Sequence, residues 1–288
     1  MITGTTKLLG VIGDPIEHSL SPVMHNAALN KLNMDYVYLP FPITSANLEQ
    51  AIAGFAAMGV MGFSVTIPHK EAIIPLLSEI SPIAYTIGAV NTVIRQGNQW
   101  IGTNTDVEGF IAPLKTTYHR DWSQTKAVIL GNGGAARAVV AGCMKLEMAE
   151  IHVVGRNVDK LRAFSHSWEN TPFPGRFQWH EWDKLPQLLP DTRLLVNTTP
   201  IGMYPKMNES PLSEQEIGYL PDGAIAYDLI YIPKPTKFLH KAEARGIIAI
   251  DGLEMLVQQG AAALKIWLQR EDIPIHEMRQ ALQHHLGF

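Results

Sequence analysis

Three short polar segments in the first half of the sequence carry side chains that could bind or transform a ligand. The segment HSLSP at residues 18–22 places two serine hydroxyls two residues apart, beside an expected helix start. The segment VTIPHK at 65–70 places a threonine and a lysine at the end of an apolar strand, and NTD at 104–106 follows an expected hairpin. Polar groups at strand ends build the ligand sites of open α/β proteins, so these segments predict a site. Helix capping is the alternative role for either serine.

A glycine-rich turn, GNGGAA at residues 131–136, follows an apolar strand directly and opens a helix. It fits the pattern G-x-G-x-x-A, in which the first glycine makes the turn and the second lets a pyrophosphate approach the backbone. The N-terminus of the helix then presents free N–H groups to an anion. A tight structural turn is the alternative, but the flanking strand and helix favour a dinucleotide site.

The next strand, 151–154, ends in Gly155, Arg156 and Asn157, where an NAD-binding chain usually places an acidic residue. An arginine can bind a 2′-phosphate through two hydrogen bonds and offers nothing comparable to a bare hydroxyl. The sequence therefore favours NADP over NAD. Lys160 either adds a second positive charge there or is an ordinary surface lysine.

Two series of alternating strands and helices must position these groups, which predicts an α/β protein with largely parallel sheets. We expect the first series as strand 8–12, a helix after Pro22, strand 36–39, helix 46–58, strand 60–67, helix 71–77 and a hairpin of 90–95 with 100–103. We expect the second as strand 127–130, helix 135–146, strands 151–154, 194–197 and 224–229, helix 235–244 and strand 247–250.

Only 37 residues follow Asp251, with helical patterns at 253–268 and 275–286. They are too few for a domain, so they must pack on one of the two α/β series. We expect either a helical lid across the cleft or a discontinuous first domain, residues 1–106 plus 252–288, with a nucleotide-binding domain at 107–251.

Composition excludes several classes of function. The 288 residues carry 23 basic and 27 acidic side chains, a net charge of −4, which gives no electrostatic case for nucleic acid or an anionic membrane. The uncharged stretch 50–68 is interrupted by glycines, so it predicts a helix and a strand rather than a membrane span. A single cysteine and a start without a signal-peptide pattern favour the cytoplasm. The sequence is compatible with a homodimer but does not determine the oligomeric state.

Metal and nucleophilic chemistry are not expected. The eleven histidines include no pair at helical ligand spacing with a carboxylate, so we expect no metal site. Ser19 lies in no strand–turn–helix elbow, and Cys143 falls inside the helix after the glycine turn, where packing explains it.

The chain resembles shikimate dehydrogenases in seven motifs, which occur in the same order along the sequence. They are the three polar segments, the glycine turn, GAVNT at 88–92, NTTPIGM at 197–203 and GLEMLVQQ at 252–259. The resemblance implies NADPH-dependent, reversible reduction of 3-dehydroshikimate to shikimate in aromatic amino acid biosynthesis. It also implies a discontinuous substrate domain and a Rossmann-like NADP domain with a cleft between them.

The resemblance also implies residue roles. Lys70 would be the catalytic acid/base, paired with Asp106, because an ammonium can protonate the oxygen that gains charge as hydride reaches the carbonyl. Substrate would bind to Ser19, Ser21, Thr66, Asn91, Asp106, Tyr231 and Gln259. NADP would bind to Gly131, Asn132, Gly133, Gly134, Ala135, Gly155, Arg156, Asn157 and Lys160, with Leu229 and Gly252 at the nicotinamide end.

One departure and two alternatives accompany these roles. Many family members read Asn-Arg-Thr where this chain reads Gly155-Arg156-Asn157, which removes a side-chain hydrogen bond at position 155. A quinate or dual quinate/shikimate dehydrogenase shares most of the site, although Arg156 and the two serines argue against it. A non-catalytic NADP-binding sensor would be expected to lack Lys70 or Asp106, and both are present.

Overall fold

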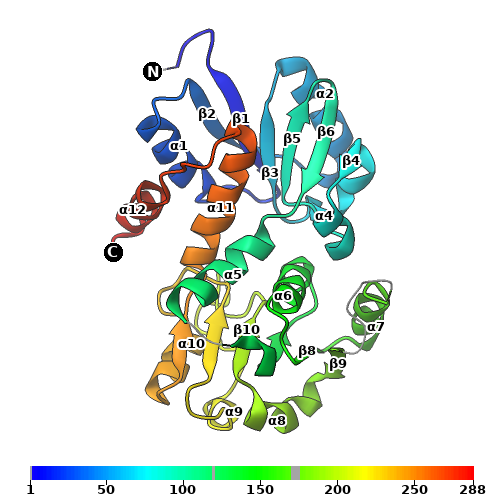
Figure 1. Cartoon of the computed structure of the whole chain (residues 1–288), viewed down its shortest axis with the longest axis vertical. Helices are drawn as coiled ribbons and strands as arrows, with labels where there is room; N and C mark the ends of the chain where they lie inside the picture. The colour runs from blue at the N-terminus through cyan, green and yellow to red at the C-terminus, as the bar shows by residue number, and fades with distance from the viewer. Residues whose placement is uncertain (1, 119–120, 170–175) are drawn as a thin grey trace. The chain divides into compact units, whose positions relative to one another are not determined.

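A computed structural model describes residues 2–118, 121–169 and 176–288 (Figure 1). Residue contacts divide the chain into two compact units. The first comprises Met1–Gly109 and Leu256–Phe288, and the second comprises Phe110–Met255. Helices α5 (Asp106–Thr117) and α11 (Leu253–Leu268) each cross a boundary between the units.

The first unit is built on a six-stranded sheet in the order β2-β1-β3-β5-β6-β4. The sheet is largely parallel, as predicted: only β5, the first strand of the predicted hairpin, runs antiparallel to its neighbours β3 and β6, and the other three pairs are parallel. A tight hairpin at Gly97, whose φ is +59°, reverses the chain between β5 and β6. The strands are β1 (Lys7–Gly13), β2 (Tyr36–Pro42), β3 (Gly62–Val65), β4 (Glu79–Ile80), β5 (Thr92–Gln96) and β6 (Gln99–Thr103).

Helices from both ends of the sequence pack in the first unit, and α1 and α12 lie side by side (Figure 1). Lys31 of α1 pairs with Glu277 of α12 at 2.8 Å, and the Trp267 Nε1 of α11 donates to the Val93 carbonyl at 2.9 Å. The expected helix 71–77 is only one turn followed by a 3-10 turn, because Pro75 interrupts it. The helices are α1 (Ser21–Lys31), α2 (Leu48–Met58), α3 (His69–Ala72), α4 (Pro82–Ile87), α11 and α12 (Ile275–Leu286).

The second unit is built on a six-stranded parallel sheet in the order β12-β11-β10-β7-β8-β9. When these strands are numbered 1 to 6 along the chain, their order in the sheet is the doubly wound order 3-2-1-4-5-6. The order reverses between β7 and β10, because the first three strands are added on one side of this point and the last three on the other. The strands are β7 (Lys126–Leu130), β8 (Glu150–Gly155), β9 (Phe177–Glu181), β10 (Leu194–Asn197), β11 (Ile225–Asp228) and β12 (Ile248–Ile250). The helices include α6 (Gly134–Lys145), α7 (Val158–His166), α8 (Leu185–Leu188), α9 (Glu214–Ile217) and α10 (Lys237–Ala244).

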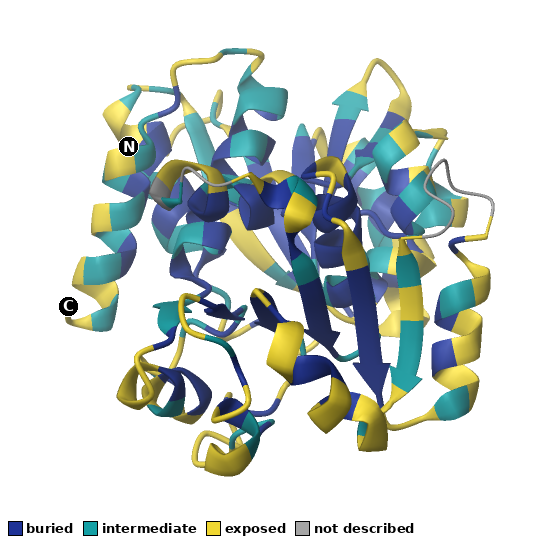
Figure 2. Cartoon of the chain, turned by 60° about the horizontal axis from the view of Figure 1, so that its bottom comes forward, coloured by how far each residue is buried: buried dark blue, intermediate teal, exposed yellow. Residues whose placement is uncertain are grey.

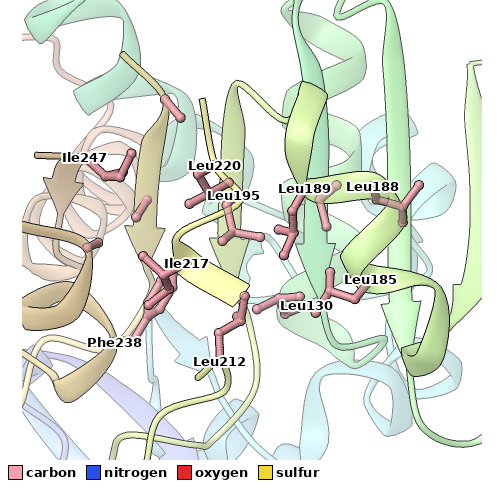
Figure 3. Close-up of a cluster of buried hydrophobic side chains, with 14 of the residues drawn as sticks. Leu130, Leu185, Leu188, Leu189, Leu195, Leu212, Ile217, Leu220, Phe238 and Ile247 are labelled. Carbon is pink, nitrogen blue, oxygen red and sulfur yellow. The ribbon is translucent and has the colours of Figure 1, made fainter. Parts of the chain in front are cut away.

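Buried residues gather on the strands, and exposed residues gather on helices and loops (Figure 2). In the second unit, Leu130 and Leu195 of the central strands pack with Leu185, Leu188 and Leu189 of the segment that leads into β10 (Figure 3). This apolar packing holds the central strands, so the loops at their carboxyl ends rest on a rigid base. Within the described part of the chain, every helix is too short or too polar to cross a membrane.

Candidate active site

Lys70 and Asp106 form an ion pair in the first unit. Lys70 lies in α3, just after β3, and Asp106 is the first residue of α5. The Lys70 Nζ donates to Asp106 Oδ2 at 2.5 Å, and the two side chains remain 20% and 11% exposed. The Lys70 carbonyl accepts from the backbone N–H of Val90 at 2.8 Å, which holds α3 against the segment before β5. The pair is therefore well positioned and still partly open to a ligand.

Asn91 holds the other oxygen of the Asp106 carboxylate. Its Nδ2 donates to Asp106 Oδ1 at 2.8 Å, and its Oδ1 accepts from the backbone N–H of Thr105 at 2.8 Å. Asn104 accepts from the Asp106 N–H at 3.0 Å and donates to the Ala89 carbonyl at 3.0 Å. The start of α5 also favours a negative charge. These contacts keep Asp106 in place, with Oδ2 bonded to Lys70.

The two serines lie at the start of α1. Leu20 occupies the N-cap position and makes no side-chain cap, so neither serine is the N-cap residue of α1. The Ser19 Oγ accepts from the Ser21 N–H at 3.4 Å, and Ser21 is buried whereas Ser19 is half-buried. This bond ties the Ser19 hydroxyl, in the loop that follows β1, to the backbone of Ser21, the first residue of α1.

The remaining residues expected at the substrate divide between the units. Thr66 follows β3, and its methyl group packs closely on Gly13. A Cβ added to Gly13 would lie 2.6 Å from the Thr66 Cγ2. Gln259 is half-buried in α11 and donates from Nε2 to the Leu256 carbonyl at 2.8 Å. Tyr231 belongs to the second unit, where burial raises its pKa. That Tyr231 contributes to the same substrate site as the first-unit residues stays a prediction.

The glycine turn lies in the second unit, between β7 and α6. Gly131 has a φ of +103°, and a Cβ on it would lie 2.8 Å from the Thr198 Oγ1 after β10. A Cβ on Gly133 or Gly134 would meet no atom within 4 Å, and α6 begins without a side-chain cap. The buried Asn132 Nδ2 has no hydrogen-bond partner among the described residues. Open space, free donors and a helix N-terminus together fit a pyrophosphate.

Arg156 follows β8 and is exposed. Asn157 caps α7, because its Oδ1 accepts from the Lys160 N–H at 2.9 Å, and the Lys160 side chain is exposed. A Cβ on Gly155 would lie 2.9 Å from the Leu161 side chain, so Leu161 occupies the space that a side chain at position 155 would need. Arg156 and Lys160 leave this strand end positively charged.

A buried polar network that we did not predict joins the ends of β10 and β11. The Asn197 Nδ2 donates to Asp228 Oδ1 at 3.0 Å, and the Thr236 hydroxyl donates to Asp228 Oδ2 at 2.7 Å. Burial raises the pKa of Asp228 to about 6, although the hydrogen bonds oppose that shift. Polar residues that end apolar strands were the available signal in the sequence. Their pairing across the sheet was not visible there.

The network continues to the residues expected at the nicotinamide end. The Leu229 N–H donates to the Asn197 carbonyl at 3.1 Å, and the Gly252 N–H donates to the Ile230 carbonyl at 3.2 Å. A Cβ on Gly252 would lie only 2.0 Å from the Leu229 carbonyl oxygen. Leu229 and Gly252 therefore touch through their backbones, a contact that only glycine allows at position 252.

Cys143 is a buried free thiol, and burial raises its pKa. Across residues 2–118, 121–169 and 176–288, no three His, Cys, Asp or Glu side chains come close enough together to hold a metal ion. The exposed His18 lies in the turn before Ser19.

Comparisons with known proteins agree over the whole chain. Residues 11–93 match the family model of the shikimate dehydrogenase substrate binding domain, and residues 252–283 match that of the shikimate 5′-dehydrogenase C-terminal domain. A shikimate dehydrogenase (NADP(+)) of Trichormus variabilis is 73% identical over 287 residues, which cover 100% of this chain and 99% of the relative.

Two solved structures show the same fold. A crystal structure of a shikimate dehydrogenase in complex with NADP+ has a TM-score of 0.91 and 38% identity, covering 99% of this chain and 97% of that one. The shikimate 5-dehydrogenase of Listeria monocytogenes, in complex with shikimate and NAD, has a TM-score of 0.88 and 34% identity, covering 98% of each chain. The chain therefore belongs to the shikimate dehydrogenase family.

Proposed function

We propose that this chain catalyses the reversible, NADPH-dependent reduction of 3-dehydroshikimate to shikimate, a step of aromatic amino acid biosynthesis. The observation that carries the proposal is the Lys70–Asp106 pair at 2.5 Å, with Asn91 on the second carboxylate oxygen. An ammonium held by a positioned carboxylate can transfer a proton to a ketone oxygen. Membership of the family supports 3-dehydroshikimate as the substrate that accepts this proton and NADPH as the hydride donor.

The proposed substrate contacts follow the polarity of shikimate, a ring with one carboxylate and three hydroxyls. Hydroxyl donors suit the carboxylate, and carboxylate or amide groups suit the ring hydroxyls. We assign Ser19 and Ser21 to the carboxylate, with Thr66 and Tyr231 nearby. We assign Asn91, Asp106 and Gln259 to the ring hydroxyls. Of these, the hydrogen bond between Asn91 and Asp106 supports the second group most directly.

The second unit would hold NADP. The turn from Gly131 to Ala135 would take the pyrophosphate, because the glycines leave open space there and Asn132 keeps an unpaired buried donor. Arg156 would bind the 2′-phosphate, with Asn157 and Lys160 beside it and Gly155 at the strand end. Leu229 and Gly252 would line the nicotinamide end. When bound, NADPH supplies the hydride that reduces the substrate ketone.

Lys70 and Asp106 supply the proton chemistry. As hydride reaches the carbonyl carbon, the C=O π electrons move to oxygen, and the Lys70 ammonium donates a proton to that oxygen. The products are shikimate, oxidised cofactor and a neutral lysine, which solvent reprotonates. Asp106 orients the Lys70 Nζ through Oδ2 and accepts a hydrogen bond from a substrate hydroxyl. In shikimate oxidation, neutral Lys70 takes the same proton back.

The domain assignment follows from these roles. We propose residues 1–106 and 252–288 as the substrate domain and residues 107–251 as the NADP domain, close to the boundaries of the two compact units. The partners are then small molecules, and a homodimer is compatible with the fold. We place the protein in the cytoplasm, where a buried free thiol such as Cys143 stays reduced and NADPH is available.

A rate measurement tests the proposal. The purified protein is given shikimate or quinate together with NADP or NAD, and the absorbance of the reduced nicotinamide is followed. We expect the highest kcat/KM with shikimate and NADP. Equal or greater kcat/KM with quinate would contradict the substrate, and preference for NAD would contradict the role of Arg156. Fluorescence titration with NADPH checks cofactor binding independently of turnover.

A further inference from the structure

Two buried polar side chains end neighbouring strands of the second sheet. Asn197 is the last residue of β10 and Asp228 is the last residue of β11, and neither side chain is exposed. Their bond, from Asn197 Nδ2 to Asp228 Oδ1 at 3.0 Å, links the points where the two strands give way to loops. An apolar pair would fill this space without the cost of burying a carboxyl, so the polar pair is explained by the other groups that it holds.

Asn197 holds the loop after β10. Its Oδ1 accepts from the Thr199 N–H at 3.0 Å and from the Thr199 hydroxyl at 2.7 Å, and its Nδ2 donates to the Ile201 carbonyl at 3.1 Å. The Thr199 Oγ1 accepts in turn from the Ile201 N–H at 3.2 Å. With the bond to Asp228, both amide protons of Asn197 are used. The Asn197 side chain therefore fixes this loop at both Thr199 and Ile201.

Asp228 holds the loop after β11 in the same way. Its Oδ1 accepts from the Ile230 N–H at 3.1 Å, and its Oδ2 accepts from the Thr236 hydroxyl at 2.7 Å. The Ile230 carbonyl accepts from the Gly252 N–H at 3.2 Å. In both loops, the side chain that ends the strand bonds the backbone N–H two residues on, which is the hydrogen bond of an Asx turn. Loss of either side chain would free its own loop and remove one bond from the other residue.

The order of the strands places these loops at one half of the cofactor. The glycine turn follows β7 and Arg156 follows β8, so the proposed pyrophosphate and 2′-phosphate sites occupy that side of the sheet. β10 and β11 lie on the other side of β7, and the Thr198 hydroxyl, after β10, donates to the Leu130 carbonyl at 2.7 Å. A dinucleotide crosses the carboxyl ends of the strands at the point where their order reverses, so its nicotinamide half would lie over β10 and β11.

We propose that Asn197 and Asp228 are positioning residues of the cofactor site, which fix the loops after β10 and β11 so that these loops present a rigid surface to the nicotinamide half of NADP. This inference rests on the proposed NADP site in the second unit. It assigns a role to two side chains that were not among the expected site residues. Because both side chains act through the backbones of their loops, their loss should weaken binding of the nicotinamide half and leave binding of the adenosine half intact.

Asn197→Ala tests the inference with two probes, NADPH and adenosine 2′,5′-bisphosphate, a fragment that carries both adenosine phosphates and lacks the nicotinamide. By isothermal titration calorimetry, we expect the Kd of NADPH to rise about two- to tenfold, the effect of one cofactor hydrogen bond lost when a loop moves, and the Kd of the fragment to stay unchanged. Asp228→Ala should do the same. Asp228→Asn should keep the NADPH affinity, because its amide oxygen can still accept from the Ile230 N–H and its amide nitrogen can donate to the Thr236 hydroxyl. Equal losses with both probes in the alanine variants would show a merely structural role and overturn the proposal.

A milder variant and a matched control accompany this test. Thr199→Val removes one link between Asn197 and its loop at a half-buried position, so it should weaken NADPH selectively even if Asn197→Ala does not fold. Thr192→Val is the control. The buried Thr192 hydroxyl donates to the Leu188 carbonyl at 2.7 Å just before β10, at the opposite end of that strand, so its loss should lower the melting temperature and change neither Kd.

The two probes also separate this inference from the proposed function. If the unaltered protein binds neither probe, the proposed NADP site fails, and the inference fails with it. If the unaltered protein binds both probes, but neither Asn197→Ala nor Thr199→Val raises the Kd of NADPH, only the inference fails.

Discussion

Replacing Lys70 with alanine removes the ammonium that we assign to proton transfer. General acid–base catalysis contributes about a hundred- to ten-thousandfold, or about 3 to 5 kcal/mol of transition-state stabilisation. We therefore expect kcat for shikimate oxidation to fall by that factor. NADP affinity should be kept, because the glycine turn and Arg156 belong to the other compact unit.

The structure also limits how much stability this variant loses. Removing one partner of a fully buried ion pair costs about 3 to 5 kcal/mol, because the other charge is left uncompensated. Asp106 would keep its bond from Asn91 and its place at the start of α5, and the Lys70 side chain is already 20% exposed. The free energy of unfolding should thus fall by only about 1 to 2 kcal/mol, less than for a fully buried pair. The variant should stay folded, which thermal denaturation can check.

Asp106→Asn and the double variant show whether the two residues act as a unit. Initial rates of shikimate oxidation at saturating NADP give kcat, and fluorescence titration gives NADPH affinity. If Asp106 works by orienting Lys70, the double variant should be scarcely slower than Lys70→Ala alone. Losses that multiply would refute the pairing. A higher KM with kcat largely preserved in Lys70→Ala would show that Lys70 only binds substrate.

Three further variants test the second unit. Arg156→Ala should raise KM for NADP about ten- to a hundredfold, the loss of about 1.5 to 3 kcal/mol for a charge-assisted hydrogen bond, and leave NAD use unchanged. Arg245→Ala, at the opposite edge of the sheet, is its control, and equal loss with both cofactors would contradict the assignment. Gly252→Ala forces a Cβ to 2.0 Å from the Leu229 carbonyl oxygen, so we expect about 1 to 3 kcal/mol less stability and weaker NADPH binding by titration; unchanged values of both would refute this. Burial raises the pKa of Asp228 from an ordinary 3.8 to about 6, so the folded state binds this proton more tightly than the unfolded state does. The free energy of unfolding should therefore fall as pH rises from about 4 through 6. Asp228→Asn should remove roughly 3 kcal/mol of that pH dependence, measured by denaturant unfolding at several pH values. An unchanged slope of the unfolding free energy against pH would contradict the raised pKa of Asp228.

The glycine turn shows what local sequence can predict. Strand 127–130, the turn and the helix after it are contiguous in the chain, so hydrophobic pattern and glycine spacing describe them directly. The structure has them as β7, Gly131 with positive φ and α6, within one residue at most boundaries. Alternating strands and helices likewise indicated the parallel sheet of the second unit.

The pairing of strands that lie far apart in the sequence was harder to predict. The antiparallel position of β5 in the first sheet depends on which strand edge the hairpin meets, and no local pattern encodes that choice. The expected helix 71–77 failed for a local reason, Pro75, whose effect the apolar spacing concealed.

The sequence by itself determined the residue types of the site, because lysine, aspartate, serine and arginine at strand ends carry their chemistry in any fold. Only the tertiary structure decided which of them meet. Lys70 and Asp106 are 36 positions apart, and Asn197 and Asp228 are 31 apart. Each contact joins segments that separate strands bring together, and a buried polar group must find its partner there because water is excluded.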